Sequence, residues 1–225
     1  MAAAAQRTNW FAIWVSVAVV AVLVVVGGVV IWLNNMAGGP GAAPRGATVN
    51  AETGAITIGD GADEVTSWFD FYCPHCQSFE ATYGPTIEEL IDDGSITLQL
   101  QPIALSSMNA ASGTEFSARS ASALYCVADD SPEAVFPFFK ALFATNPTGP
   151  GQTDDELAAM AADAGAPGAA DCIADGTYTK FALAQAAKLP PNPETGSAGT
   201  PTLLINGEYV PVTGDVAADL TSRLG

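Results

Sequence analysis

Apolar and polar residues are distributed unevenly along this chain and divide it into three regions. Residues 10–33 contain no charged side chain, whereas residues 34–54 are rich in Gly, Ala, Pro and Asn. From residue 55 onward, short apolar runs alternate with polar turns. This pattern predicts an apolar helix, a flexible linker over 34–54, and one folded domain over 55–225.

The apolar segment 10–33 has the length of a membrane-spanning helix, since about 36 Å of helix crosses a bilayer with some tilt. Arg7 and the N-terminal amine favour a cytoplasmic location for residues 1–9, with everything after the helix outside. The alternative is a cleaved signal peptide, because the Ala-rich stretch 37–43 permits cleavage, but such peptides have apolar cores of only about 7–15 residues. We therefore expect a single-pass anchor in the cell membrane.

The folded region begins with alternating strand and helix signals. Three apolar runs predict strands, at residues 55–58, 65–72 and 96–103. The run 65–72 is apolar enough to be buried on both faces of a sheet. Between the last two runs, residues 74–92 predict a helix that Gly84-Pro85 should kink or split. These signals together predict a β-α-β unit.

An Ala-rich helical region over about 109–189 follows. Pro and Gly clusters divide it into expected helices at 114–128, 132–144, 154–164 and 178–188. After it, Asn206-Gly207 lies between apolar runs, which predicts a hairpin with Glu208–Val212 as its second strand. Residues 215–224 predict a closing helix that Asp215 caps.

Charge excludes one class of partner. The chain has 225 residues and a net charge of −17, and its 24 acidic residues all lie after residue 50. Five of the seven basic residues lie in that same region, which therefore carries a charge of −19. Because a phosphate backbone would be repelled, we expect no nucleic-acid partner.

The chemically informative stretch is Cys73-Pro74-His75-Cys76, at the junction between an apolar run and a helix. Unpaired N–H groups and the helix dipole stabilise a thiolate at a helix N-terminus. Pro74 fits the first helical turn, and His75 adds positive charge when it is protonated. A stabilised thiolate favours the reduced form, so such a site tends to give its disulfide to other proteins.

A C-x-x-C pair can instead be half of a zinc site. Zinc needs four ligands, but Cys126 and Cys172 are far apart and His75 is the only histidine. We therefore expect no metal, and thiol-disulfide exchange requires no organic cofactor.

Cys-Pro-His-Cys after an apolar strand resembles the active site of the DsbA-like branch of the thioredoxin superfamily. The helical region over 109–189 resembles the insertion of that branch, and the hairpin with its closing helix resembles the thioredoxin-fold ending. The resemblance implies an α/β thioredoxin fold with a helical insertion, here preceded by one transmembrane helix. It also implies that Pro201 is cis and faces the cysteines, with Thr200 and Pro201 pairing with substrate. Local sequence alone predicts an ordinary trans proline.

The other two cysteines are candidates for a structural disulfide. With Cys73 and Cys76 assigned to the motif, Cys126 and Cys172 remain. In an oxidising compartment we favour a bridge, which would close a loop of about 47 residues and contribute about 4 kcal/mol in the chain-entropy model. Two buried free thiols are the alternative.

The sequence departs from its relatives at one position. Many thioredoxin-fold enzymes have a buried carboxylate six residues before the first cysteine, where this chain has Ser67. The nearest acid is Asp70, and our hypothesis is that Asp70 accepts the proton of Cys76 when that thiol attacks a mixed disulfide. A solvated aspartate at the end of a strand is the alternative.

The resemblance implies an enzyme that introduces disulfides into reduced exported proteins, with Cys73 exposed and Cys76 shielded. A membrane partner, either a DsbB-like protein or a homologue of vitamin K epoxide reductase, would reoxidise it. A membrane-anchored reductase or isomerase of the same fold is one alternative. A non-enzymatic copper chaperone is another, but it requires C-x-x-x-C and a second histidine, which the chain lacks.

Overall fold

The computed structural model describes residues 39–225, together with residues 10, 14–15, 19–20, 22 and 25–27. The chain divides into two compact units at Gly39/Pro40, and the second unit, residues 40–225, is considered below. Most of the anchor predicted over 10–33 lies outside the described residues. Among the residues that are described, no helix is both long and apolar enough to span a membrane.

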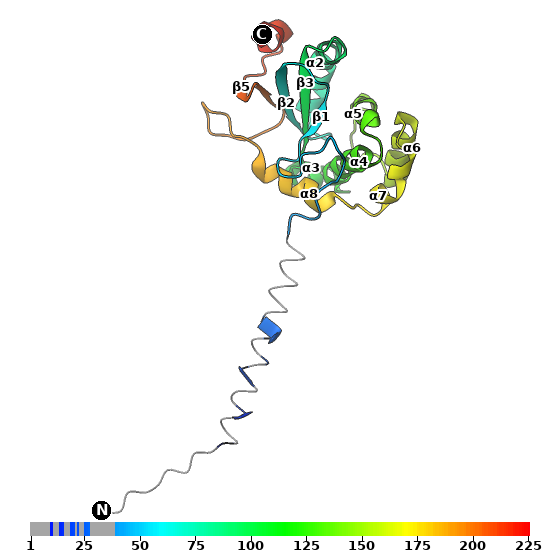
Figure 1. The fold of residues 1–225 in the computed structure, drawn as a ribbon, viewed down its shortest axis with the longest axis vertical. Helices are drawn as coiled ribbons and strands as arrows, with labels where there is room; N and C mark the ends of the chain where they lie inside the picture. Colours follow the sequence, from blue (N-terminus) through cyan, green and yellow to red (C-terminus); the bar gives the residue numbers. More distant parts are fainter. Residues whose placement is uncertain (1–9, 11–13, 16–18, 21, 23–24, 28–38) are drawn as a thin grey trace, which may run out of the picture. The chain divides into compact units, whose positions relative to one another are not determined.

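A five-stranded sheet with the order β1-β3-β2-β4-β5 forms the centre of this unit (Figure 1). The strands are β1 (Ile56–Ile58), β2 (Asp63–Phe69), β3 (Ile96–Pro102), β4 (Thr202–Ile205) and β5 (Glu208–Val210). Strands β2 and β3 are parallel, and the other neighbours are antiparallel. The middle position of β2 explains why Val65 to Phe69 are all buried.

Strand β2 ends at Phe69, three residues before the predicted end. The chain turns at Asp70, whose carbonyl accepts the N–H of Cys73 at 3.0 Å and whose carboxylate accepts the N–H of Tyr72 at 2.9 Å. These bonds take up backbone donors that a longer strand would have used for sheet pairing. The turn points the chain directly into the next helix.

Helix α2 (Pro74–Asp92) runs without interruption through Pro85. Of the two outcomes expected at Gly84-Pro85, a kink or a split, the split is therefore wrong. Tertiary packing overrides the local signal, because Phe79, Tyr83 and Ile87 bury one face of the helix. The missing side chain of Gly84 leaves room for the Glu80 carboxylate, which lies 2.5 Å from the place a Cβ atom would occupy. A glycine before the proline is therefore part of the packing.

The helical insertion lies between β3 and β4, and in the view of Figure 1 its helices α4 to α8 lie below the sheet and to its right. It consists of α3 (Ser106–Ser112), α4 (Phe116–Asp130), α5 (Val135–Ala144), α6 (Asp154–Ala164), α7 (Ala170–Ala174) and α8 (Thr179–Gln185). Helix α4 is buried along almost its whole length and contacts each of the others. The sequence did not predict α3 and α7, because seven and five residues are too few to show a helical period.

Short 3₁₀ turns complete the insertion at Pro132–Ala134, Pro167–Ala169 and Ala186–Lys188. Two of them replace helical residues that the sequence predicted. The predicted helix 132–144 begins with such a turn before α5, and the predicted helix 178–188 ends with one after α8.

A disulfide joins Cys126 of α4 to Cys172 of α7 across 46 positions of sequence. It ties the central helix of the insertion to the short helix α7. Two buried free thiols, the alternative that the sequence left open, are not what the structure contains.

Residues 40–54 belong to the compact unit, although the sequence predicts a flexible linker there. The Asp129 carboxylate accepts the N–H groups of Arg45 and Gly46 at 2.8 and 2.6 Å. Val49 forms a β-bridge with Ile56. Gly46 approaches the backbone so closely that a Cβ atom would lie 2.4 Å from the Ala128 carbonyl oxygen. Composition alone therefore set the domain boundary about 15 residues too late.

The C-terminal part departs from the predicted single helix over 215–224. Asp215 caps α9 (Val216–Asp219) by accepting the N–H groups of Ala217 and Ala218. The backbone leaves helical geometry at Leu220, whose side chain is completely buried, and a 3₁₀ turn (Thr221–Arg223) follows.

Replacing both Cys126 and Cys172 with alanine should lower the free energy of unfolding by about 2–5 kcal/mol, because the unfolded chain regains the entropy of an open loop. Urea unfolding followed by far-UV circular dichroism measures this loss. The Cys73→Ala/Cys76→Ala variant is the matched control for the loss of two buried sulfurs. Equal stability of the two double variants would contradict a stabilising role for the bridge.

Candidate active site

The Cys73-Pro74-His75-Cys76 stretch lies where β2 has ended and α2 begins. Cys73 occupies the N-cap position of α2, and Pro74 is the first helical residue, as its missing N–H allows. The Cys73 carbonyl accepts the Gln77 N–H at 3.1 Å, which closes the first turn of the helix. Parallel strands β2 and β3 thus deliver the two sulfurs at the C-terminal edge of the sheet.

The two thiols have opposite electrostatic surroundings. A hydrogen bond from the Cys76 thiol is the main reason that the pKa of Cys73 falls to about 5, and the backbone N–H groups of Cys76 and His75 add to the effect. Burial has the opposite result at Cys76, whose pKa lies well above its ordinary value. At neutral pH the reduced pair therefore carries its negative charge on Cys73 and its proton on Cys76.

The two cysteines differ strongly in pKa but hardly in exposure, whereas the sequence suggested an exposed Cys73 and a shielded Cys76. Cys73 is 3% exposed and Cys76 is 1% exposed, so Cys73 is not the openly exposed sulfur that the sequence suggested. The chain before β4 packs beside Cys73, and the Thr200 carbonyl oxygen lies 3.5 Å from the Cys73 sulfur.

The Thr200–Pro201 peptide bond is cis, and both residues are partly exposed beside the cysteines. His75 is exposed on the first turn of α2. The backbone of His75 contributes to the Cys73 thiolate, which gives this position a part in the site regardless of its imidazole.

Asp70 is completely buried, which excludes the solvated aspartate that the sequence allowed as an alternative. Its carboxylate accepts the N–H groups of Tyr72 and Leu105, each at 2.9 Å. Burial raises the pKa of Asp70 to about 6, against the opposing effect of these hydrogen bonds. A carboxyl group with this pKa can take up and release a proton near neutral pH.

A groove of about 380 Å³ lies beside the cis peptide, and we call it the cis-proline groove. Its walls include His75, Tyr83, Pro201, Tyr209 and Gly214. Tyr83 and Tyr209 were not predicted as site residues, because nothing in the local sequence pattern connects the middle of a helix with the second strand of a hairpin. Hydroxyl groups and aromatic rings predominate in this groove, and none of its lining residues is acidic.

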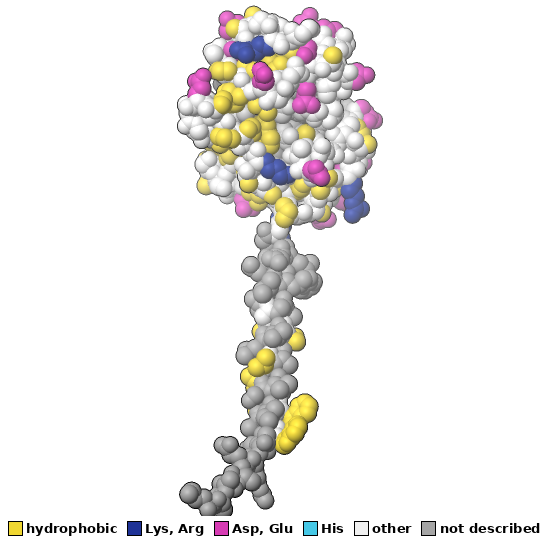
Figure 2. Space-filling model, turned by 60° about the vertical axis from the view of Figure 1, so that its left-hand side comes forward, with side chains coloured by type: hydrophobic (Ala, Val, Ile, Leu, Met, Phe, Trp, Pro, Cys, Tyr) yellow, Lys and Arg dark blue, Asp and Glu magenta, His cyan; other side chains and the backbone are white. Residues whose placement is uncertain are grey.

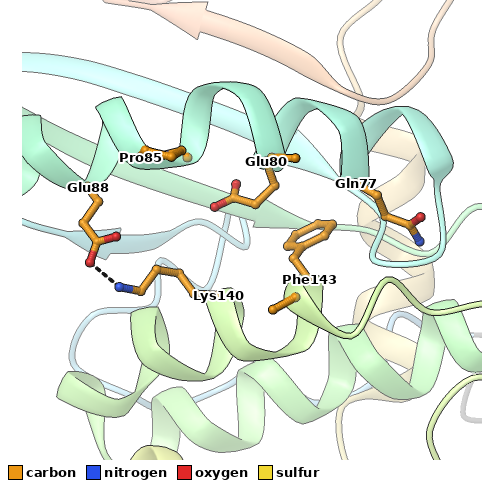
Figure 3. Close-up of a pocket in the computed structure, with 9 residues that line it drawn as sticks. Gln77, Glu80, Pro85, Glu88, Lys140 and Phe143 are labelled. Atoms are coloured by element: carbon orange, nitrogen blue, oxygen red, sulfur yellow. Dashed lines mark hydrogen bonds and ion pairs between the residues drawn. The ribbon is translucent and has the colours of Figure 1, made fainter.

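A second groove, of about 250 Å³, lies between α2 and α5 (Figure 3). Glu80 points into it from α2, and Glu88 forms an ion pair with Lys140 across it. Burial raises the pKa of Glu80 to about 7; Lys140 opposes the shift and Glu88 adds to it. Glu80, one turn of α2 after Cys76, is thus a second carboxyl group whose pKa lies close to neutrality, and no local sequence signal marks it.

Acidic side chains are spread over the face shown in Figure 2, with only a few basic ones between them. No group of three or more His, Cys, Asp or Glu side chains is arranged to hold a metal ion within the part of the chain that the structure describes. The candidate reactive groups of this unit are therefore the two cysteines, Cys73 and Cys76, whose pKa values are shifted in opposite directions.

The sequence model of the thioredoxin family matches residues 52–219. DsbA from Mycobacterium tuberculosis, in its oxidised form, is 30% identical to this chain with a TM-score of 0.61, and the match covers 71% of this chain and 86% of that one. The chain belongs to the DsbA-like branch of the thioredoxin superfamily. It is a thiol-disulfide oxidoreductase.

Other solved structures resemble this DsbA-like protein. The reduced form of the disulfide bond oxidoreductase DsbG from Mycobacterium tuberculosis is 29% identical, with a TM-score of 0.58 and coverage of 80% of this chain and 85% of that one. MdbA, a thiol-disulfide oxidoreductase from Actinomyces oris, is 22% identical, with a TM-score of 0.62 and coverage of 82% and 92%. At that identity the likeness to MdbA shows the fold alone. No curated protein sequence matches the chain significantly.

The Cys73 thiolate of the reduced protein should titrate near pH 5, whereas an ordinary thiol titrates near 9. Its absorbance at 240 nm, with the oxidised protein as blank, measures this. Since the pKa is lowered on folding, the stability that ionisation gives the reduced protein is complete above about pH 9 and is lost as the pH falls to about 5. The free energy of unfolding of the reduced protein, relative to that of the oxidised protein, should therefore decrease as the pH is lowered from about 9 to about 5. A midpoint near pH 9 in the absorbance titration would contradict a stabilised thiolate at Cys73.

Proposed function

We propose that this protein donates disulfides to reduced exported proteins. The observation that supports the proposal is the opposite shift of the two thiol pKa values, down to about 5 at Cys73 and upward at Cys76. The thiolate with the lower pKa is the better leaving group in thiol-disulfide exchange. A reduced site that is stable as the Cys73 thiolate makes the oxidised site a strong donor.

The reaction proceeds through two exchanges. A substrate thiolate attacks the Cys73 sulfur, the Cys73–Cys76 bond breaks, and Cys76 leaves and takes up a proton. A second substrate thiolate then attacks the substrate sulfur of the mixed disulfide, and Cys73 leaves as a thiolate. The substrate gains one disulfide and loses two electrons, which the enzyme retains as its reduced pair.

The substrate approaches through the cis-proline groove. The Thr200 carbonyl oxygen lies 3.5 Å from the Cys73 sulfur, so the backbone around Thr200 and Pro201 is placed to pair with an extended chain that reaches this sulfur. The groove contains no acidic side chain in a domain that is otherwise strongly acidic. It therefore suits extended segments with apolar and uncharged polar side chains around the reacting cysteine.

The proposal also includes a cellular location and a partner that reoxidises the cysteine pair. The uncharged stretch 10–33 would anchor the protein in the cell membrane with the redox domain on the extracytoplasmic side. The Cys126–Cys172 bridge fits an oxidising compartment. A donor must also be reoxidised, which requires a membrane partner such as a DsbB-like protein or a homologue of vitamin K epoxide reductase.

The equilibrium of Cys73/Cys76 with glutathione should show a potential well above the value of about −270 mV that is typical of thioredoxin. The fractions of reduced and oxidised protein are measured by alkylation and mass spectrometry in buffers of known glutathione ratio. The wild-type protein should also form disulfides in a reduced, unfolded model protein. A potential as low as that of thioredoxin would favour the membrane-anchored reductase or isomerase instead.

Asp70 is proposed as the group that accepts the Cys76 proton during reoxidation. The Asp70→Asn variant should slow the attack of Cys76 on a Cys73–glutathione mixed disulfide by about tenfold or more above pH 6, and should remove an inflection near pH 6 from the rate profile. Rapid mixing with quenched-flow alkylation measures the rate.

Asp93→Asn, at the exposed end of α2, is the control and should leave the profile of the Cys76 attack unchanged. If the Asp70→Asn profile keeps its inflection near pH 6, Asp70 is not the proton acceptor.

A further inference from the structure

We propose that Tyr83 and Asp219 are positioning residues that hold the far wall of the cis-proline groove in place for an extended peptide. This inference rests on the proposed function, because it assigns a role to residues of the same groove. Neither side chain reaches the sulfurs, so both act through the segment that they hold.

We call the segment Val212–Gly214, which lines the groove together with residues of α2 and the cis peptide, its far wall. Strand β5 ends at Val210, so ladder pairing does not fix this segment. Its N–H groups are instead directed inward. Thr213 N–H donates to the Asp219 carboxylate at 2.6 Å, and Gly214 N–H donates to the same carboxylate at 3.2 Å.

Tyr83 connects this wall to α2. Its hydroxyl donates to the Asp219 carboxylate and accepts the Gly214 N–H at 2.9 Å. The Thr213 hydroxyl donates to Asp219 at 2.9 Å, which completes a closed network. The Tyr83 ring also stacks on Phe79 with 4.5 Å between centroids, and this fixes the direction of the hydroxyl. Helix α2 thus carries Cys76 in its first turn and, further along, the tyrosine that holds the Val212–Gly214 wall of the groove.

Both side chains of the Tyr83–Asp219 pair are almost inaccessible to solvent, since Tyr83 is 1% exposed and Asp219 is 2% exposed. Burial acts to raise the pKa of Asp219, but the hydrogen bonds from Tyr83, Thr213 and Gly214 outweigh it and lower the pKa. Burial and the Asp219 contact raise the pKa of Tyr83 to about 12, so the hydroxyl stays protonated as a donor. A charged acceptor that satisfies several donors holds the groups bonded to it in fixed positions.

The chain contains a matched pair that has no connection with the groove. The Tyr178 hydroxyl donates to the Asp129 carboxylate, which also accepts two backbone N–H groups from residues 45 and 46. Burial and the contact with the carboxylate raise the pKa of Tyr178 to about 12 as well. Variants of this pair remove the same kind of hydrogen bond, and neither residue lines the groove.

The experiment compares two reductants of the oxidised full-length protein. One is a synthetic dithiol peptide of uncharged composition, which occupies the groove, and the other is dithiothreitol, which reaches the sulfurs without it. Tyr83→Phe should lower the rate with the peptide about threefold and Asp219→Asn about tenfold, because an ordered wall is lost. The rate with dithiothreitol and the pKa of Cys73 should stay within about twofold of wild type.

Tyr178→Phe and Asp129→Asn should leave both rates unchanged. Since Asp219→Asn could impair folding, Tyr83→Phe decides the case, as it removes only one hydroxyl group. Unchanged peptide rates in Tyr83→Phe, or an equal slowing with both reductants, would overturn the positioning role. A wild-type protein that oxidises neither reductant would instead overturn the proposed function, so the two failures are distinguishable.

Discussion

The site depends on where the negative charge of the reduced cysteine pair resides. Cys73 occupies the N-cap of α2, receives a hydrogen bond from the Cys76 thiol, and lies among backbone N–H groups of the first helical turn. Cys76 lies one turn inside the helix and is too deeply buried to ionise easily. One helix end thus stabilises an anion on the first sulfur while burial keeps the second sulfur neutral.

The rest of the domain holds that helix end in place. Strand β2, buried on both faces, delivers the chain to the turn at Asp70, whose carboxylate fixes the backbone on either side of the site. The insertion encloses this carboxylate and is itself held by α4 and the Cys126–Cys172 bridge. Across the sheet, the chain before β4 brings the Thr200 carbonyl against Cys73. The same contacts that order the site also cover it, and the cis-proline groove is the route that we propose for an incoming polypeptide.

The domain combines strong acidity with an uncharged groove. Acidic side chains are distributed over the surface shown in Figure 2, whereas the lining of the cis-proline groove contains none. The general charge keeps the domain soluble, and it leaves recognition to aromatic and hydroxyl groups at the groove. Two carboxyl groups, the completely buried Asp70 and the partly buried Glu80, have pKa values near neutrality because burial opposes their ionisation.

Local sequence determined the elements whose signals are short-range. The motif Cys73–Cys76, the hairpin turn at Asn206-Gly207 and the boundaries of helix α6 all follow from neighbouring residues, because caps and turns are decided within a few positions. Tertiary structure decided what depends on distant segments. Packing against the sheet kept α2 intact through Pro85, the Asp129 carboxylate held residues 45 and 46, and the closed wall around Cys73 reduced its exposure to 3%. Contacts such as the one between Tyr83 and Asp219 join residues 136 positions apart, so no local pattern could have revealed them.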